Sequence, residues 1–98
     1  MNLKLNYEGY EQNLVYTNRL LNGIQYVFKF ENDYGASVIK HDGSYGHRDD
    51  LWELAVAKFG DADKRDWHLD YDTEITDDVI GSLTDEEVRN LLARIKEL

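Results

Sequence analysis

A chain of 98 residues has the commonest size of one folded domain, so we expect a single domain over residues 1–98. It contains no cysteine, which excludes disulfides, thiolate catalysis and cysteine-ligated metals and makes a cytoplasmic location the expectation. The formal net charge of −9 argues against direct binding to nucleic acid, because affinity for phosphates comes mainly from lysine and arginine.

The first strand is expected at residues 2–8, where Leu3, Leu5 and Tyr7 alternate with polar side chains. This alternation is unlike the continuous apolar stretch of a signal peptide, and no later run approaches the ~20 apolar residues that a membrane span requires. We therefore expect neither export by that route nor insertion into a membrane.

A β-hairpin is predicted for residues 14–21 and 24–30. The intervening Asn22-Gly23 pair accommodates the two positive φ angles of a type I′ turn, the connection that matches the twist of paired strands. In the second arm one face is apolar and should meet the core; it consists of Ile24, Tyr26, Phe28 and Phe30.

Turn-forming residues at 31–35 separate this hairpin from a strand expected at 36–41. Residues 42–50 then carry two glycines and have no apolar period, which indicates an exposed loop. Residues 51–59 are apolar on both faces, which favours a central strand, although a helical period also fits and leaves helix as the alternative.

A turn at 60–64 precedes a strand expected at 65–71, with Trp67, Leu69 and Tyr71 facing inward. The outward positions are acidic or polar: Asp66, His68, Asp70 and Asp72.

The last element is an amphipathic helix. It begins at a capping box, in which Thr84 accepts from the backbone of Glu87 while the Glu87 side chain reaches back to Thr84. A single apolar stripe follows at helical spacing: Val88, Leu91, Leu92, Ile95 and Leu98. The predicted fold class is therefore α+β, a meander-like antiparallel sheet of five to six strands packed against one C-terminal helix.

Metal and cofactor sites are not expected. The three histidines, His41, His47 and His68, lack the spacing that makes zinc ligands converge. The alternating Asp70, Asp72 and Glu74 look like the start of a calcium loop. In that loop the sixth residue must be glycine and the twelfth glutamate, and here they are isoleucine and glycine.

Catalytic signatures are equally lacking: there is no phosphate-binding glycine loop, no nucleophile motif and no carboxylate pair that the sequence places across a cleft. No catalytic residue is assigned, and a non-enzymatic role is expected.

Acidic residues are concentrated in the C-terminal part of the chain. Residues 1–60 hold 8 acids and 6 lysines or arginines, whereas residues 61–98 hold 12 and 5. Between Asp66 and Glu87 there are nine acids and no lysine or arginine. This tract is either a solvated surface, or a row of charges that mimics phosphates. The predicted partner-binding acids are Asp66, Asp70, Asp72, Glu74, Asp77 and Asp78.

Two Tyr-Gly pairs flank the strand expected at 36–41. Tyr34 and Tyr45 are candidate interface anchors, because tyrosine adds a large amphipathic contact area at a small entropic cost. The alternative is that both tyrosines close turns and pack over the edge of the sheet.

Three segments resemble a family of small uncharacterised proteins encoded by bacteriophages and prophages. They are residues 26–46 (YVFKFENDYGASVIKHDGSYG), 51–56 (LWELAV) and 69–88 (LDYDTEITDDVIGSLTDEEV). The resemblance assigns no catalytic residue. It implies a phage accessory role in the host cytoplasm, where acidic proteins of this size often inhibit defence nucleases, as anti-CRISPR and anti-restriction proteins do.

Two functions remain open from the sequence. The first is a non-enzymatic, acidic inhibitor that binds a basic nucleic-acid-handling host protein, such as a CRISPR effector or a restriction enzyme, without binding nucleic acid itself. The second is a structural or self-assembling accessory protein, in which an exposed sheet edge pairs two copies and the acids serve solubility.

Overall fold

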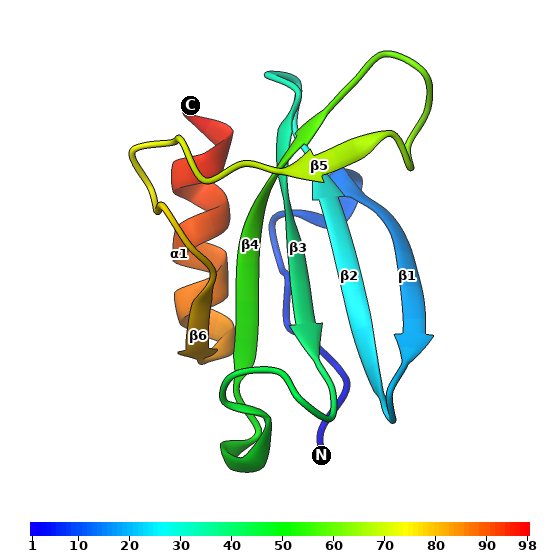
Figure 1. Ribbon diagram of the computed structural model, residues 1–98, viewed down its shortest axis with the longest axis vertical. Coiled ribbons are helices and arrows are strands. Elements are labelled where there is room, and N and C mark those ends of the chain that lie inside the picture. The colour runs from blue at the N-terminus through cyan, green and yellow to red at the C-terminus, as the bar shows by residue number, and fades with distance from the viewer.

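The computed structural model describes residues 1–98 and contains a six-stranded antiparallel sheet with one helix packed against it (Figure 1). This arrangement confirms the predicted α+β class. The strands are β1 (Leu14–Leu20), β2 (Gly23–Lys29), β3 (Tyr34–Lys40), β4 (Trp52–Phe59), β5 (Trp67–Leu69) and β6 (Ile80–Leu83). The helix is α1 (Asp85–Lys96), and two short 3-10 turns are η1 (Glu11–Asn13) and η2 (His47–Asp49).

The strands follow one another as a meander in the order β1-β2-β3-β4-β5. The free side of β4 is shared, because β5 pairs with its last residues while β6 pairs with Trp52 and Leu54. Residues 51–59 are therefore a central strand rather than a helix, and β4 is buried on both faces, as its apolar pattern predicts.

The hairpin of β1 and β2 is confirmed, but its turn lies one residue earlier than predicted. Leu21 and Asn22 have the positive φ angles, and Leu20 pairs with Gly23. Gly23 is instead the first residue of β2, where a Cβ atom would collide with the carbonyl oxygen of Lys40. Because Gly23 has no Cβ, β3 can approach it closely, and the local sequence does not reveal this requirement.

The helix begins where the capping box predicts. The Glu87 N–H donates to Thr84 Oγ1 over 3.2 Å, and the Thr84 N–H donates to Glu87 Oε1 over 3.0 Å. Val88, Leu91, Leu92 and Ile95 are buried in the main core together with apolar residues of β2, β3 and β4. At the other end the Asn32 amide donates to three carbonyl oxygens of the last turn.

The strand predicted at 2–8 is wrong as a strand, although the burial pattern that suggested it is present. Leu5 is buried, and Leu3 and Tyr7 are partly buried, while the residues between them are exposed. Residues 2–7, which we call the N-terminal strap, run over the helix side of the sheet without pairing with any strand. The alternation reflects contact with the core, because Tyr7 packs against Tyr26 and Phe28.

A second, smaller apolar cluster lies on the face of the sheet that the helix does not cover. It contains Val27, Ala57 and Phe59, with Trp67 packed against it. Trp67 donates a hydrogen bond of 2.6 Å to the hydroxyl of Tyr16, so β5 reaches across this face to β1 (Figure 1).

The structure has no helix of the length and hydrophobicity that crossing a membrane requires.

Candidate functional site

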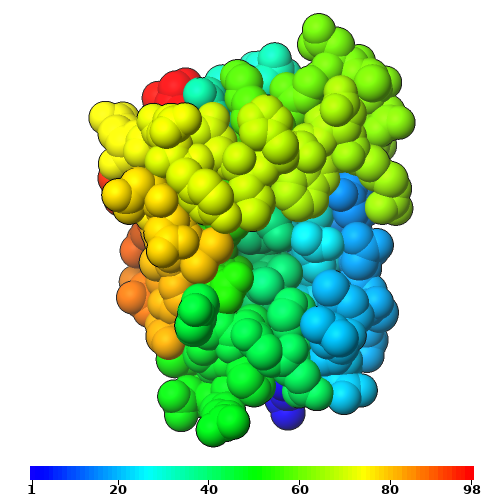
Figure 2. Space-filling view, in the orientation of Figure 1, coloured from blue at the N-terminus to red at the C-terminus, as the bar shows by residue number.

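The acidic residues singled out in the sequence occupy one stretch of chain, residues 66–78, which we call the acidic ledge. It starts at the β4–β5 turn, passes through β5 and continues as irregular backbone to β6. Figure 2 shows much of it as a yellow band across the upper part of the visible face. Five of the six predicted acids are exposed and Asp70 is partly buried, so the ledge presents its carboxylates to solvent.

Half of these acids shape the backbone of the ledge. The Asp66 carboxylate accepts from the N–H of Ala62 over 3.3 Å, and Asp70 accepts from the N–H of Asp72 over 2.8 Å. Asp78 accepts from the N–H of Val79 over 2.7 Å. Such bonds are typical of turns that aspartate stabilises. The side chains of the other three acids, Asp72, Glu74 and Asp77, make no hydrogen bond within the chain.

The regular row of charges that a strand would give is not formed. Strand β5 ends at Leu69 instead of continuing to residue 71, so Asp70 and Asp72 lie beyond it. The Asp70 N–H still donates to the Val56 carbonyl of β4, while the Asp70 carboxylate accepts from the N–H of Asp72, and bends of the backbone begin at residue 73. Beyond Leu69 the acids therefore lie on irregular backbone and not at the spacing of a strand.

No basic side chain neutralises the ledge. The two ion pairs of the structure join Lys29 to Asp33 over 3.3 Å and Lys40 to Asp50 over 3.1 Å. The adjacent Arg65 instead places its guanidinium 4.1 Å from the ring centre of Tyr16. The charge of the ledge is therefore available to a partner.

Two apolar side chains stand exposed among these acids, which corrects the prediction that they face the core. Leu69 is 40% exposed and Tyr71 is 39% exposed, whereas Trp67 packs inward as expected. Leu69 pairs with Ala57 on the sheet face that lacks a helix, and Tyr71 follows the end of β5. Period-2 alternation indicates which side chains share a face and does not reveal whether that face is covered.

The two candidate tyrosines have different surroundings. Tyr34 packs against the main core, and the Nζ of Lys58 lies 4.1 Å from its ring centre. Tyr45 is 68% exposed, and its loop lies against β6, where a Cβ atom on Gly81 would come within 2.5 Å of the Cβ of Tyr45. Because β6 continues the ledge, Tyr45 lies near its end, while Tyr34 is a structural residue.

The histidines do not converge. The Nδ1 of His41 lies 2.9 Å from the Asp42 carbonyl oxygen, and the Nδ1 of His47 lies 2.6 Å from that of Ser44. His68 pairs with Lys58 in the sheet. No group of three or more histidine, cysteine, aspartate or glutamate side chains is placed to hold a metal ion.

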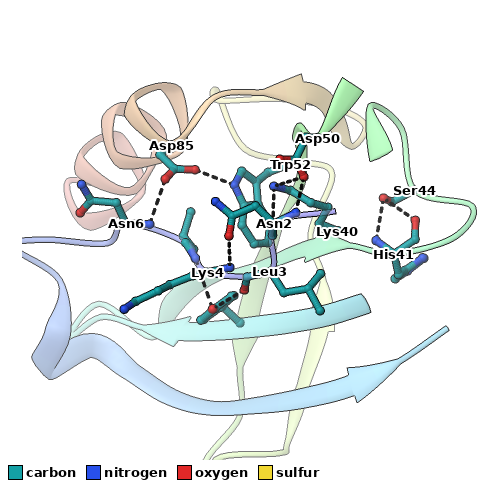
Figure 3. Close-up of polar contacts among 12 residues, drawn as sticks. Asn2, Leu3, Lys4, Asn6, Lys40, His41, Ser44, Asp50, Trp52 and Asp85 are labelled. Carbon is teal, nitrogen blue, oxygen red and sulfur yellow. Dashed lines mark hydrogen bonds and ion pairs between the residues drawn. The ribbon is translucent and has the colours of Figure 1, made fainter. Parts of the chain in front are cut away.

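A polar network around the N-terminal strap was missed by the sequence analysis (Figure 3). The ammonium group of Lys40, a residue only 2% exposed, donates to the Asn2 carbonyl over 2.7 Å and lies 4.1 Å from the ring centre of Trp52. Asp50 accepts from the N–H of Asn2 over 2.7 Å as well as from Lys40. The Asn2 N–H bond, followed by the Lys40 bond, lowers the pKa of Asp50 below its usual 3.8.

A second carboxylate fixes the other end of the strap. Asp85 accepts from Trp52 Nε1 over 2.7 Å and from the N–H of Asn6 over 3.1 Å (Figure 3). Arg89 donates to the Asn6 carbonyl over 2.9 Å. Between these ends, the Tyr26 hydroxyl donates to the Leu3 carbonyl. These bonds hold the strap against β2, β3 and α1, so the network acts as a structural latch.

Comparison with family models, with curated proteins and with solved structures found no match for this chain.

Proposed function

We propose that this protein is a non-enzymatic inhibitor that binds a basic, nucleic-acid-handling protein through the acidic ledge. One observation carries the proposal. The ledge combines acids that have no ion-pair partner with two exposed apolar side chains, Leu69 and Tyr71. A surface that served solubility alone would gain nothing from exposing Leu69 and Tyr71 together among its acids. Tyrosine is enriched among the residues that anchor protein interfaces, and Leu69 adds apolar area beside Tyr71.

The side chains of the ledge indicate what kind of surface its partner has. The acids require lysine or arginine side chains opposite them, and a surface that normally binds nucleic acid supplies these in number. Leu69 and Tyr71 require apolar pockets between those basic groups on the partner. A nucleic acid has no such pockets along its phosphate backbone. Nucleic acid itself is repelled by the ledge and competes with it for the partner.

In this proposal the binding takes place in a host cell, the setting that the sequence resemblance to phage-encoded proteins implies. A defence protein such as a CRISPR effector or a restriction enzyme has the required basic groove, and occupation of that groove by the ledge would exclude DNA. In this proposal Tyr45 extends the contact surface beyond β6.

The test is affinity capture from host lysate with three forms of the protein as bait. The first is the wild type, the second carries Asp70→Asn, Asp72→Asn and Glu74→Gln together, and the third carries Tyr71→Ser. Asparagine retains the oxygen that accepts from the Asp72 N–H, so the triple variant keeps the turn. We expect the wild type to capture a nucleic-acid-binding protein that both variants lose or bind more weakly, and we expect added DNA to displace it.

Salt distinguishes the two contributions to affinity. Binding of the wild type should weaken steeply between ~50 and ~200 mM salt, since exposed charges are screened over ~10 Å at 0.1 M. The triple variant should show a flatter dependence. Tyr71→Ser and Tyr45→Ala should lower the affinity without changing the slope. If the triple variant binds as tightly as the wild type with the same slope, the ledge is a solvated surface and the proposal is wrong.

A further inference from the structure

Strand β1 is the free edge of the sheet, and no acid lies on it. It pairs with β2 on one side and with no strand on the other. Residues 12–30, which contain β1 and β2, hold no aspartate or glutamate and two basic residues, a net charge of +2. The rest of the chain holds 20 acids and 9 basic residues, a net charge of −11. This hairpin therefore lacks the carboxylates that would oppose the approach of two copies elsewhere on the chain.

The opposite edge of the sheet is protected. Strand β5 is three residues long, and the loop between β3 and β4 contacts β6, since the Ser82 N–H donates to the Tyr45 carbonyl over 3.2 Å. Natural sheets shorten or cover their edges in this way to prevent pairing with other chains. In β1 the irregularity between Leu14 and Tyr16 interrupts only the start of the strand, which leaves Tyr16–Leu20 regular and open.

No contact within one chain explains why a leucine occupies position 21. Leu21 occupies the hairpin turn with a φ of 47°, a conformation that favours asparagine or glycine, and its side chain is 62% exposed. Both the positive φ angle of Leu21 and the exposure of its apolar side chain to water are unfavourable in the isolated chain. A contact outside the chain would bury the side chain and offset the hydration cost.

We propose that β1 binds β1 of a second copy, antiparallel and centred on Asn18, so that the two sheets become one. In a two-residue hairpin the residues flanking the turn form a hydrogen-bonded pair, so Thr17 and Arg19 direct their N–H and C=O groups away from β2. Centring the pairing on Asn18 places Thr17 opposite the partner's Arg19 and makes these outward groups bond each other.

This register also places compatible side chains opposite each other. Tyr16 lies opposite the partner's Leu20, and Leu21 follows Leu20 at the end of the paired region. The two copies of Arg19 face threonines rather than each other, which avoids the like-charge pair that centring on Arg19 would create. The two-fold axis is perpendicular to the joined sheet, so both acidic ledges face the same side and a dimer presents two of them.

The absence of cysteine allows a direct test. In the proposed register Asn18 faces the partner's Asn18 in a pair without hydrogen bonds, where Cα atoms lie ~4.5 Å apart, within the range of a disulfide. Asn18→Cys should form a cross-linked dimer rapidly under mild oxidation. The matched control is Tyr45→Cys, which is more exposed but distant from β1 and should cross-link only slowly.

Light scattering on the uncross-linked protein gives the second measurement. The wild type should show a mass approaching twice the 11.5 kDa of one chain as its concentration rises. Thr17→Pro removes an N–H that points away from β2, a substitution that edge strands tolerate, and should leave a folded monomer. Leu21→Asn fits the turn better but loses the apolar contact, so it should weaken the dimer roughly tenfold or more while the chain stays folded.

A wild type that stays monomeric from micromolar to millimolar concentration, with Asn18→Cys cross-linking no faster than Tyr45→Cys, would overturn the proposal. This outcome would leave the ledge proposal intact, because the variants at β1 do not alter the ledge.

Discussion

The N-terminal strap and the part of the acidic ledge beyond β5, residues 70–78, are both irregular segments that border the sheet, yet they are held in opposite ways. Six side-chain hydrogen bonds tie the strap to the rest of the chain, and they join residues 21 to 83 positions apart. The side-chain hydrogen bonds of the ledge beyond β5 span one or two positions, and the long-range bond of the ledge, from Trp67 to Tyr16, lies within β5. Irregular backbone is thus built into the tertiary structure in the first case and only locally shaped in the second.

Burial follows the same division. Leu5 of the strap is 3% exposed and belongs to the main core, whereas Leu69 of the ledge is 40% exposed. On the ledge, Ile75 is the side chain that packs against that core from beyond the end of β5. We therefore expect the strap to contribute to stability and the ledge to be free for binding.

The sharpest test of this contrast is one pair of leucine substitutions. Leu5→Ala should lower the free energy of unfolding by about 2–5 kcal/mol, because it leaves a cavity in the core. Leu69→Ala should change it by less than about 0.5 kcal/mol, because the side chain already contacts solvent. Urea unfolding of both variants measures the difference. Equal effects would mean that the strap does not form part of the core.

A smaller effect is expected from the carboxylates of the two segments. Asp85→Ala should cost about 1–3 kcal/mol, because the Trp52 Nε1 donor loses its partner and the strap loses one of its bonds. Asp72→Ala, on the ledge, removes a side chain without a hydrogen bond and should be nearly neutral. Thermal unfolding of the two variants provides the comparison, and a destabilised Asp72→Ala would show that the ledge also supports the fold.

The ionised carboxylate of Asp50 helps to hold the strap. The bonds from the Asn2 N–H and from Lys40 hold the pKa of Asp50 below 3.8 in the folded state, so its ionised form favours folding. This contribution is complete above the ordinary pKa and is lost as the pH falls through the lowered value.

Asp50→Asn should therefore be less stable than the wild type at neutral pH, and the gap should close below about pH 4. Unfolding curves from pH 7 to acid pH measure this change. A gap that does not depend on pH would show that the charge of Asp50 is unimportant.

The same contrast explains which features were predictable from the sequence. The capping box of Thr84 and Glu87 and the hairpin depend on neighbouring residues, and both were found. The turn was predicted one residue too late. Gly23 is required by the close approach of the Lys40 carbonyl on β3 and not by the turn. The strap was predicted as a strand because its side chains alternate between apolar and polar. This alternation indicates burial, but it does not show that the hydrogen-bond partners of the strap are as distant as Asp85. Strand β6 was missed because four residues next to an acidic tract carry little signal.

For the candidate site, the acids were visible in the sequence and their surroundings were not. The exposure of Leu69 depends on whether a layer covers that side of β5, a tertiary property that alternation cannot express. The packing of Tyr34 likewise depends on Lys58 of a neighbouring strand.

The smallest expected effect concerns the charge of the ledge itself. Replacing Asp70, Asp72 and Glu74 with Asn, Asn and Gln should change the free energy of unfolding by less than about 0.5 kcal/mol per site. The sign should be stabilising at low salt, because the acids repel one another and have no basic partner. Added salt screens this repulsion, so the wild type should gain stability with salt more than the variant does, and the two should converge. Urea unfolding at low and high salt measures both slopes. If the triple variant is instead less stable at every salt concentration, the ledge acids take part in folding, and the division between a structural strap and a free ledge is wrong.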